Sequence, residues 1–349
     1  MVVGGLGTFV GLGLLAGCIS VGVSFVTMLM SVAFVGLSAS GLLEFVNRRW
    51  SRRTAVASLV GLVSLAVVRV VSVDMPSATV EPGGGSSRWL NRVIPESDGV
   101  ELMAWLMTTL GVQGISDREY EGFQAAADRE YSRMEMAVGS IPSPLVSTLL
   151  RLQSPDAFDL IVIEPRGVGA GDDAVVFLHG AAGNWALLCW LVADGLPADV
   201  TVYCPSTDGS GNWSGDDNRR IVEATVGRAY ADGAQNLTLV GLSAGAASLN
   251  AVLDGFEPGI FSEAVYLFGG SSSPPVHEIP SLFVLGTEDE RFPLGALVGV
   301  VDERRRGGGA VAVRTVEADH FGLLKEHAKV AEAVLSWFSA RRSRGRAGD

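Results

Sequence analysis

Residues 238–249 read TLVGLSAGAASL, in which a short apolar run enters a G-x-S-x-G pentapeptide and then a segment of helix-forming residues. The pattern predicts a strand, a sharp turn at Ser243 and a helix. A serine in such a turn takes strained backbone angles, and glycine on either side avoids a steric clash. The helix start also supplies N–H groups and a positive dipole end. Ser243 is therefore the candidate nucleophile, with an ordinary tight turn as the alternative.

A second segment, VVFLHGAAG at residues 175–183, predicts a strand that ends in a loop of small residues. Small side chains let backbone N–H groups approach a developing negative charge, which is what an oxyanion hole requires. Ala181 and Ala244 are the expected N–H donors, with Ala182 as an alternate. His179 precedes this loop, so we expect it to shape the loop instead of acting as a base.

Short β-rich apolar runs alternate with helical stretches from Phe158 onward. Such alternation predicts an α/β fold, a mostly parallel sheet flanked by helices. The expected catalytic domain covers 158–340, and a disordered basic tail follows at 341–349. The expected strands are 159–163, 174–178, 199–204, 236–241, 264–269, 281–286 and 310–316, and the expected helices are 184–194, 217–232, 244–255, 294–305 and 323–340.

The stretch from about Phe158 to Phe338 resembles the α/β-hydrolase superfamily, because a His-Gly loop, a nucleophile elbow, an acidic loop and a late histidine follow in family order. The resemblance implies the α/β-hydrolase fold and an acid in the loop after strand 281–286. Asp289 holds that place, three residues after Gly286. Glu288 and Glu290 remain competitors for the role.

The resemblance also implies a base in the loop after strand 310–316, where His320 lies. One ring nitrogen must reach the serine hydroxyl and the other the carboxylate, so that the acid fixes the tautomer and stabilises the imidazolium. Ser243, Asp289 and His320 are thus the expected catalytic triad. We expect His277, in a loop, and His327, on a helix, at the surface.

Only about eleven residues separate strands 264–269 and 281–286, too few for the helical cap that many members of the superfamily insert there. The chain therefore resembles the uncapped members: carboxylesterases, dienelactone-hydrolase-like enzymes and polyester-depolymerase-like enzymes. Trp185 and Trp213 either line the substrate pocket or simply pack in the interior.

Residues 1–74 are expected to form a transmembrane anchor of two or three helices that contacts membrane lipid. Met1–Leu43 carries no charged side chain, about twice the ~20 apolar residues that one crossing needs. A basic loop, Arg48–Arg53, precedes a further apolar run, and basic loops stay cytoplasmic, so the catalytic domain should lie outside the cytoplasm. A lipoprotein cleavage box ending at Cys18 is the alternative.

A Gly/Pro/Ser-rich linker is predicted at 75–87 and a helical lead-in at 88–157, either a lid, a packing layer or a spacer. The net charge is −12 although the first 75 residues are basic, so the remainder is strongly acidic, which argues against nucleic-acid binding. Three cysteines offer no metal-binding spacing, and Cys189 and Cys204 can pair only if the fold brings them together.

Together these features predict a multi-pass membrane protein with a serine hydrolase domain. It would cleave a small-molecule ester or thioester through an acyl-enzyme, with no metal or cofactor. A serine peptidase with the same triad is a close alternative. A non-catalytic, membrane-tethered binding domain is another.

Overall fold

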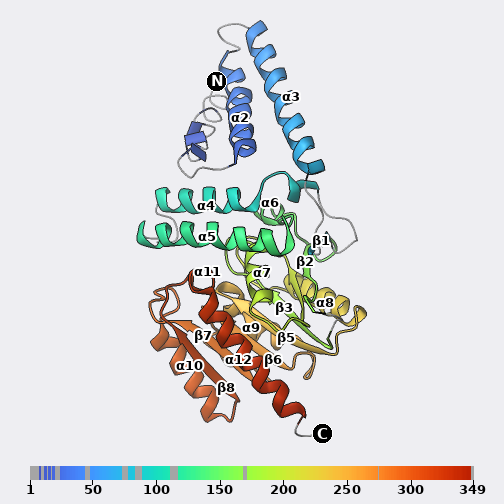
Figure 1. The fold of residues 1–349 in the computed structure, drawn as a ribbon, viewed down its shortest axis with the longest axis vertical. Coiled ribbons are helices and arrows are strands. Elements are labelled where there is room, and N and C mark those ends of the chain that lie inside the picture. The colour runs from blue at the N-terminus through green and yellow to red at the C-terminus, as the bar shows by residue number, and fades with distance from the viewer. Residues whose placement is uncertain are drawn as a thin grey trace. The chain divides into compact units, whose positions relative to one another are not determined.

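The computed structural model describes residues 24–43, 48–72, 78–82, 89–110, 117–167, 171–273 and 275–346, with a few positions before residue 20 (Figure 1). The chain divides into two compact units. The first comprises residues 1–74 and 92–124, and the second comprises residues 75–91 and 125–349.

The first unit is helical in its described part. It contains α2 (Phe25–Leu43), α3 (Arg48–Ser72), α4 (Glu96–Leu110) and the start of α5 (Asp117–Val138). Asp98 on α4 is buried, and its Oδ1 accepts the Ser24 N–H at 3.0 Å, just before α2 begins. A carboxylate there satisfies an N–H and complements the helix dipole, so α4 caps α2.

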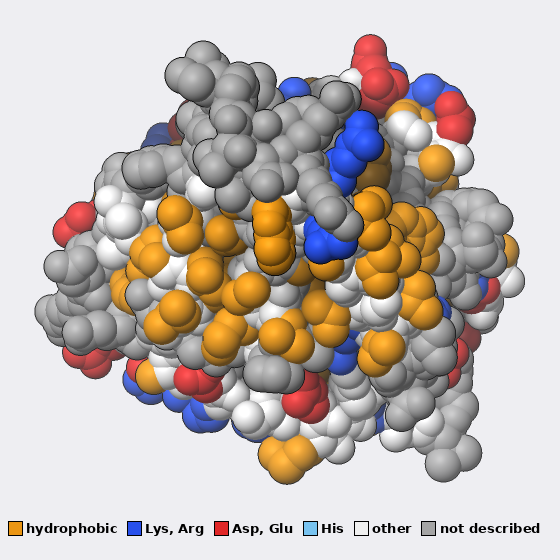
Figure 2. Space-filling model, turned by 90° about the horizontal axis from the view of Figure 1, so that it is seen from above, with side chains coloured by type: hydrophobic (Ala, Val, Ile, Leu, Met, Phe, Trp, Pro, Cys, Tyr) orange, Lys and Arg blue, Asp and Glu red, His pale blue; other side chains and the backbone are white. Residues whose placement is uncertain are grey.

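Within the described residues, one helical span, Trp50–Arg69, is long and apolar enough to cross a membrane. Figure 2, which is turned by 90° from the view of Figure 1, shows hydrophobic side chains gathered over much of the face that it presents. The prediction of a basic loop at Arg48–Arg53 is wrong, because these residues form the first turns of α3. Two or three crossings remain a prediction, as most of residues 1–23 lie outside the described part. The exposed large hydrophobic residues of α3 include Val56, Leu59, Val60, Val63, Val67 and Val68.

The second unit is built on an eight-stranded sheet in the order β1-β2-β4-β3-β5-β6-β7-β8. β2 runs antiparallel to both β1 and β4, and the other neighbours are parallel. The predicted class, an α/β fold with a mostly parallel sheet between helices, is confirmed. The strands are β1 (Ala78–Pro82), β2 (Asp159–Ile163), β3 (Asp173–Leu178), β4 (Thr201–Pro205), β5 (Asn236–Leu242), β6 (Glu263–Leu267), β7 (Ser281–Gly286) and β8 (Val311–Val316).

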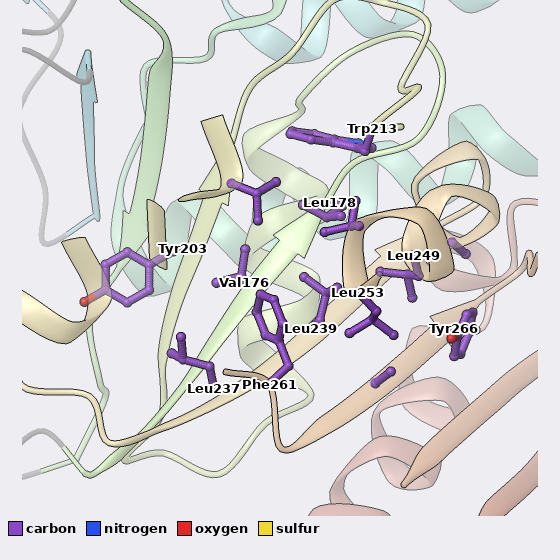
Figure 3. Packing of buried hydrophobic residues seen from close by; sticks show 14 of the residues in the cluster. Val176, Leu178, Tyr203, Trp213, Leu237, Leu239, Leu249, Leu253, Phe261 and Tyr266 are labelled. Atoms are coloured by element: carbon purple, nitrogen blue, oxygen red, sulfur yellow. The ribbon is translucent and has the colours of Figure 1, made fainter. Parts of the chain in front are cut away.

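Helices cover both faces of this sheet (Figure 1). On one face α8, α9 and α10 pack against alternate residues of the strands, and Figure 3 shows Val176, Leu239 and Leu253 in that cluster. α7 and α12 cover the other face. Strands buried on both faces read as continuous apolar runs, which is why the sequence located them. The helices and the 3-10 turn are η1 (Trp89–Arg92), α6 (Leu145–Leu149), α7 (Ala186–Asp194), α8 (Asp216–Ala231), α9 (Ala244–Leu253), α10 (Leu294–Arg306), α11 (Gly322–Lys325) and α12 (His327–Arg346).

The expected disordered tail is wrong for most of its length, because α12 continues to Arg346 and residues 347–349 alone lie outside the described part. Arg341 Nε lies 2.5 Å from Glu263 Oε1, and Arg342 Nη2 lies 2.8 Å from Asp173 Oδ2. These ion pairs join the helix end to the starts of β6 and β3. They supply the tertiary contact that a basic segment needs to stay helical.

The predicted linker is also partly structured. Residues 78–82 form β1 at the sheet edge and pair with β2 from Ala78↔Ile163 to Pro82↔Asp159. The remaining linker positions, 75–77 and 83–87, lie outside the described residues. Proline is tolerated at the last position of an edge strand, because no ladder hydrogen bond inside the sheet is lost there. The proline and the neighbouring glycines made the segment look like a linker in the sequence.

The fold brings Cys189 and Cys204 together in a disulfide that joins α7 to β4, with their Cα atoms 6.2 Å apart. Both residues are fully buried. The pairing that the sequence left conditional is therefore present. Closing a loop of this length stabilises a fold by about 3 kcal/mol in the chain-entropy model. Cys18 is a free, buried cysteine in the first unit.

Candidate active site

Ser243 occupies the turn between β5 and α9 with φ 54° and ψ −116°. A side chain at either flanking glycine would overlap the backbone. A Cβ on Gly241 would lie 2.7 Å from Ala246 N, and one on Gly245 would collide with Leu178 O. Two glycines are thus a steric requirement of this turn, which holds the serine above the carboxyl end of the sheet.

Three side chains from separate loops meet at this turn. His320 Nε2 lies 2.8 Å from Ser243 Oγ, and His320 Nδ1 lies 2.9 Å from Asp289 Oδ2. Each imidazole nitrogen therefore has one partner, the hydroxyl on one side and the carboxylate on the other. This is the geometry that proton transfer from a serine requires, with the acid fixing the tautomer. The structure brings together all three residues singled out from the sequence.

Asp289 is held by its own loop. Its Oδ1 accepts the backbone N–H groups of Arg291 at 2.9 Å and Phe292 at 3.0 Å, which leaves Oδ2 for His320. The residue is 4% exposed, whereas Glu288 and Glu290 are exposed. Three acids adjoin one another in the sequence, but only the middle one points inward.

The imidazole of His320 is packed between aromatic rings. The Phe292 ring stacks on it with centroids 5.7 Å apart and 18° between the planes, and the Phe321 ring approaches edge-on at 5.9 Å. Such contacts restrict the ring to one orientation. Nothing in the sequence identified Phe292 for this role, because its contact with residue 320 depends on how two loops pack.

The two expected oxyanion donors remain available. Among the described residues no acceptor binds the N–H of Ala181 or of Ala244. Gly180 lies directly against the serine, where an added Cβ would be 3.0 Å from Ser243 Cβ. Ala182 does not fit the role of alternate donor, because its N–H already donates to Gly209 O at 2.8 Å. Ala181 and Ala244 thus stay the candidates for stabilising a negative oxygen.

His179 is a fully buried residue at the base of the oxyanion loop. Its Nδ1 donates to Gly180 O at 2.8 Å, and its Nε2 accepts the Thr207 N–H at 3.1 Å. Burial lowers the pKa of His179 from 6.5 to about 4, so the ring is neutral near pH 7. It connects the loop after β3 to the loop after β4, in keeping with a loop-shaping role.

The remaining candidates take structural positions. Trp213 is fully buried and donates from Nε1 to His179 O at 3.0 Å, and Trp185 is buried and donates to Ala182 O at 3.1 Å. Both tryptophans therefore pack and brace the loop. His277 is exposed as expected. The expectation for His327 is wrong, because it is 4% exposed and lies 3.0 Å from Asp194 on α7.

Within the described ranges, no three His, Cys, Asp or Glu side chains gather as metal ligands. Of the site residues, the ones that the sequence did not reveal are the supports: Thr207, Gly209 and Phe292. Each contacts the site through backbone or ring packing, which leaves no motif in the sequence.

No family model and no curated protein matches the sequence. Solved structures similar to this chain include Est1E from Butyrivibrio proteoclasticus (TM-score 0.44, 15% identity, 54% of this chain and 95% of that one). A phospholipase/carboxylesterase from Dyadobacter fermentans has a TM-score of 0.40 and 18% identity over 50% of this chain and 95% of that one. A putative dienelactone hydrolase from Klebsiella pneumoniae has a TM-score of 0.38 and 14% identity over 52% and 93%. Similarities this low carry no conclusion about activity.

The buried neutral His179 predicts a stability loss in mild acid. Because its pKa falls from 6.5 in the unfolded chain to about 4 in the fold, the unfolded chain binds more protons between these values. The contribution of neutral His179 to the free energy of unfolding is then fully present above pH 6.5, and it decreases by up to about 3 kcal/mol as the pH falls to 4. Melting temperatures measured across this range should drop less steeply for His179→Gln than for the wild type. The exposed His277→Gln is the control, and equal slopes in all three proteins would contradict the assignment.

Proposed function

We propose that this chain is a serine hydrolase that cleaves a small-molecule ester or thioester through an acyl-enzyme. The observation that carries the proposal is the continuous pair of hydrogen bonds from Ser243 through His320 to Asp289. Ser243 is only partly buried in its turn, and the N–H groups of Ala181 and Ala244 lie on the neighbouring loop and helix start.

In the first step, Ser243 Oγ attacks the carbonyl carbon while its proton passes to His320 Nε2. The carbonyl oxygen becomes negative and accepts hydrogen bonds from Ala181 and Ala244. Asp289 stays ionised and stabilises the imidazolium through Nδ1. The proton then moves to the leaving alcohol or thiol, which departs as the acyl-enzyme forms. Water then attacks the acyl carbon while His320 accepts a proton from it, and His320 passes that proton to Ser243 Oγ as the bond between the acyl carbon and Oγ breaks, which releases the acid and the free serine.

A peptidase would use the same groups, and substrate profiling separates the two activities. A non-catalytic binding domain has less support. A hydrolase-like fold without activity has no need to keep a serine, a histidine and an aspartate joined by hydrogen bonds, as Ser243, His320 and Asp289 are here.

A fluorophosphonate probe tests the nucleophile. The full-length protein in detergent should form a covalent adduct on Ser243, and Ser243→Ala should form none, because only an activated hydroxyl attacks the probe. Mass spectrometry of the digested protein locates the adduct. Ser336→Ala, an exposed serine on α12, is the matched control and should label like the wild type. Equal labelling of wild type and Ser243→Ala would end the proposal.

The identity of the acid can be decided by three isosteric variants. Asp289→Asn should lower kcat on a short-chain ester by about 10⁴, because the amide no longer holds the correct tautomer of His320. Glu288→Gln and Glu290→Gln are matched controls from the same loop and should stay within about threefold of the wild type, since both side chains are exposed. A larger loss in either Glu variant than in Asp289→Asn would overturn the assignment.

We further propose that the catalytic domain lies outside the cytoplasm and that N-terminal helices anchor it in the membrane. Two features support this. The candidate span Trp50–Arg69 is preceded by Arg48 and Arg49, a basic flank typical of the cytoplasmic side. The domain beyond it carries the Cys189–Cys204 disulfide, and disulfides are rare in the cytosol.

Thiol trapping before lysis tests this location. Cells that express the protein are quenched in acid, and the precipitated protein is dissolved in denaturant at neutral pH and alkylated, because the thiolate is the reactive form. The purified chain is then reduced and alkylated with a heavier reagent. We expect Cys189 and Cys204 to carry the heavy label, since they were oxidised in the cell, and Cys18 to carry the light label. Light label on all three cysteines would place the domain in a reducing compartment.

A further inference from the structure

The segment that holds α6 forms a fixed wall beside the candidate active site. Ser147 Oγ donates to Asp159 Oδ2 at 2.6 Å, and Gln153 Nε2 donates to the same oxygen at 2.9 Å. The Asp159 N–H donates in return to Gln153 Oε1 at 2.8 Å. Ser147 and Asp159 are fully buried. These buried hydrogen bonds tie α6 to β2 and make it a rigid part of the domain.

α6 reaches the oxyanion loop through two close packing contacts. A Cβ on Gly183 would lie 3.0 Å from Thr148 Cγ2, and a Cβ on Gly209 would lie 3.8 Å from Leu149 Cδ2. Gly209 O is the acceptor of the Ala182 N–H, one residue after the candidate donor Ala181. Leu149 therefore packs on the peptide that braces the oxyanion loop.

The same segment leaves large hydrophobic side chains in solvent. Leu149 is 52% exposed and Leu150 is 59% exposed, and Leu152 follows at 45%. Three of the seven exposed large hydrophobic side chains described in residues 125–346 thus fall within four consecutive positions. Scattered apolar residues on a surface need no explanation, but a cluster whose first member, Leu149, lies against the loop that braces the oxyanion loop predicts a ligand contact.

Charges of both signs lie around the site. Glu288 and Glu290 are exposed on either side of Asp289, and Asp208 adjoins Gly209. Arg291 and Lys325 lie over the Phe321 ring, and Arg151 is exposed between Leu150 and Leu152. The domain as a whole is acidic, and its negative net charge disfavours anionic substrates, which include acyl groups carried on phosphorylated thiols.

From this placement we propose that Leu149 and Leu150 form an apolar wall that takes the hydrocarbon part of a neutral ester, so that the enzyme prefers medium-chain over short-chain acyl esters. The proposal rests on the proposed serine hydrolase function and names the substrate class of that same site. It also gives part of the helical lead-in, the segment with α6, a role as a wall of the site instead of a lid or a spacer. Each methylene that leaves water against the wall adds to the binding of the transition state.

The test compares p-nitrophenyl acetate with p-nitrophenyl octanoate, both neutral, using the full chain in nanodiscs. Wild-type kcat/KM should be at least about tenfold higher for the octanoate, because several methylenes are buried. The double variant Leu149→Ser, Leu150→Ser should lower the octanoate-to-acetate ratio by about fivefold or more. The comparison between proteins in the same nanodiscs cancels any partitioning of the substrate into lipid. Leu335→Ser on α12, another exposed leucine, is the control and should leave the ratio as it is in the wild type.

A wild-type ratio near one, or a ratio that is the same in the double variant, would overturn the wall while labelling of Ser243 and acetate turnover kept the hydrolase proposal intact. No turnover of either ester together with no labelling of Ser243 would overturn both. Circular dichroism and melting temperature establish that the variants are folded. If the double variant is unfolded, the single variant Leu149→Ser supplies the same comparison, because Leu149 is the one of the two that lies against the loop at Gly209.

Discussion

The steric limit on the turn at Ser243 is the constraint on which the site depends. With φ at 54°, the serine backbone lies in a region that costs about 1–3 kcal/mol for a residue with a side chain. The strain persists because the surroundings determine it. Gly241 allows β5 to approach α9 within backbone contact, Gly245 allows α9 to approach the end of β3 in the same way, and the Ser243 N–H donates to Leu267 O at 2.9 Å on β6. The position of Ser243 is therefore fixed by backbone contacts with three neighbouring elements.

Convergence of the other groups follows from the parallel sheet. β5, β7 and β8 all end at the same edge, so the loops after them emerge side by side. Two backbone bonds join the last two loops, from Thr287 N to Val316 O and from Glu288 N to Ala318 O, both about 3 Å long. Asp289 and His320 are brought within reach of the serine by topology, and their final orientation comes from local packing.

The contrast between positions set by topology and orientations set by local packing explains what could be predicted from the sequence. Strand positions followed from continuous apolar runs, and Ser243 followed from its place between a predicted strand and a predicted helix. Asp289 and His320 followed from the resemblance to the α/β-hydrolase superfamily, which implies an acid and a base in those two loops. β1 was missed because five residues among glycines and prolines carry no periodic signal. The extension of α12 was missed because the acidic partners of Arg341 and Arg342 lie far away in the sequence, so the two arginines looked like part of a solvated tail. His327 was misplaced for the same reason, since its partner Asp194 is more than a hundred residues away. The position of α6 also depends on a buried network with β2 that has no sequence motif.

The most direct test of the proposed active site is a crystal structure of the full chain after reaction with a small phosphonate. We expect density that joins phosphorus to Ser243 Oγ, with one phosphonyl oxygen about 3 Å from the N atoms of both Ala181 and Ala244, and the imidazole of His320 in contact with Asp289. An adduct on another residue, or an imidazole of His320 turned away from the serine, would contradict it.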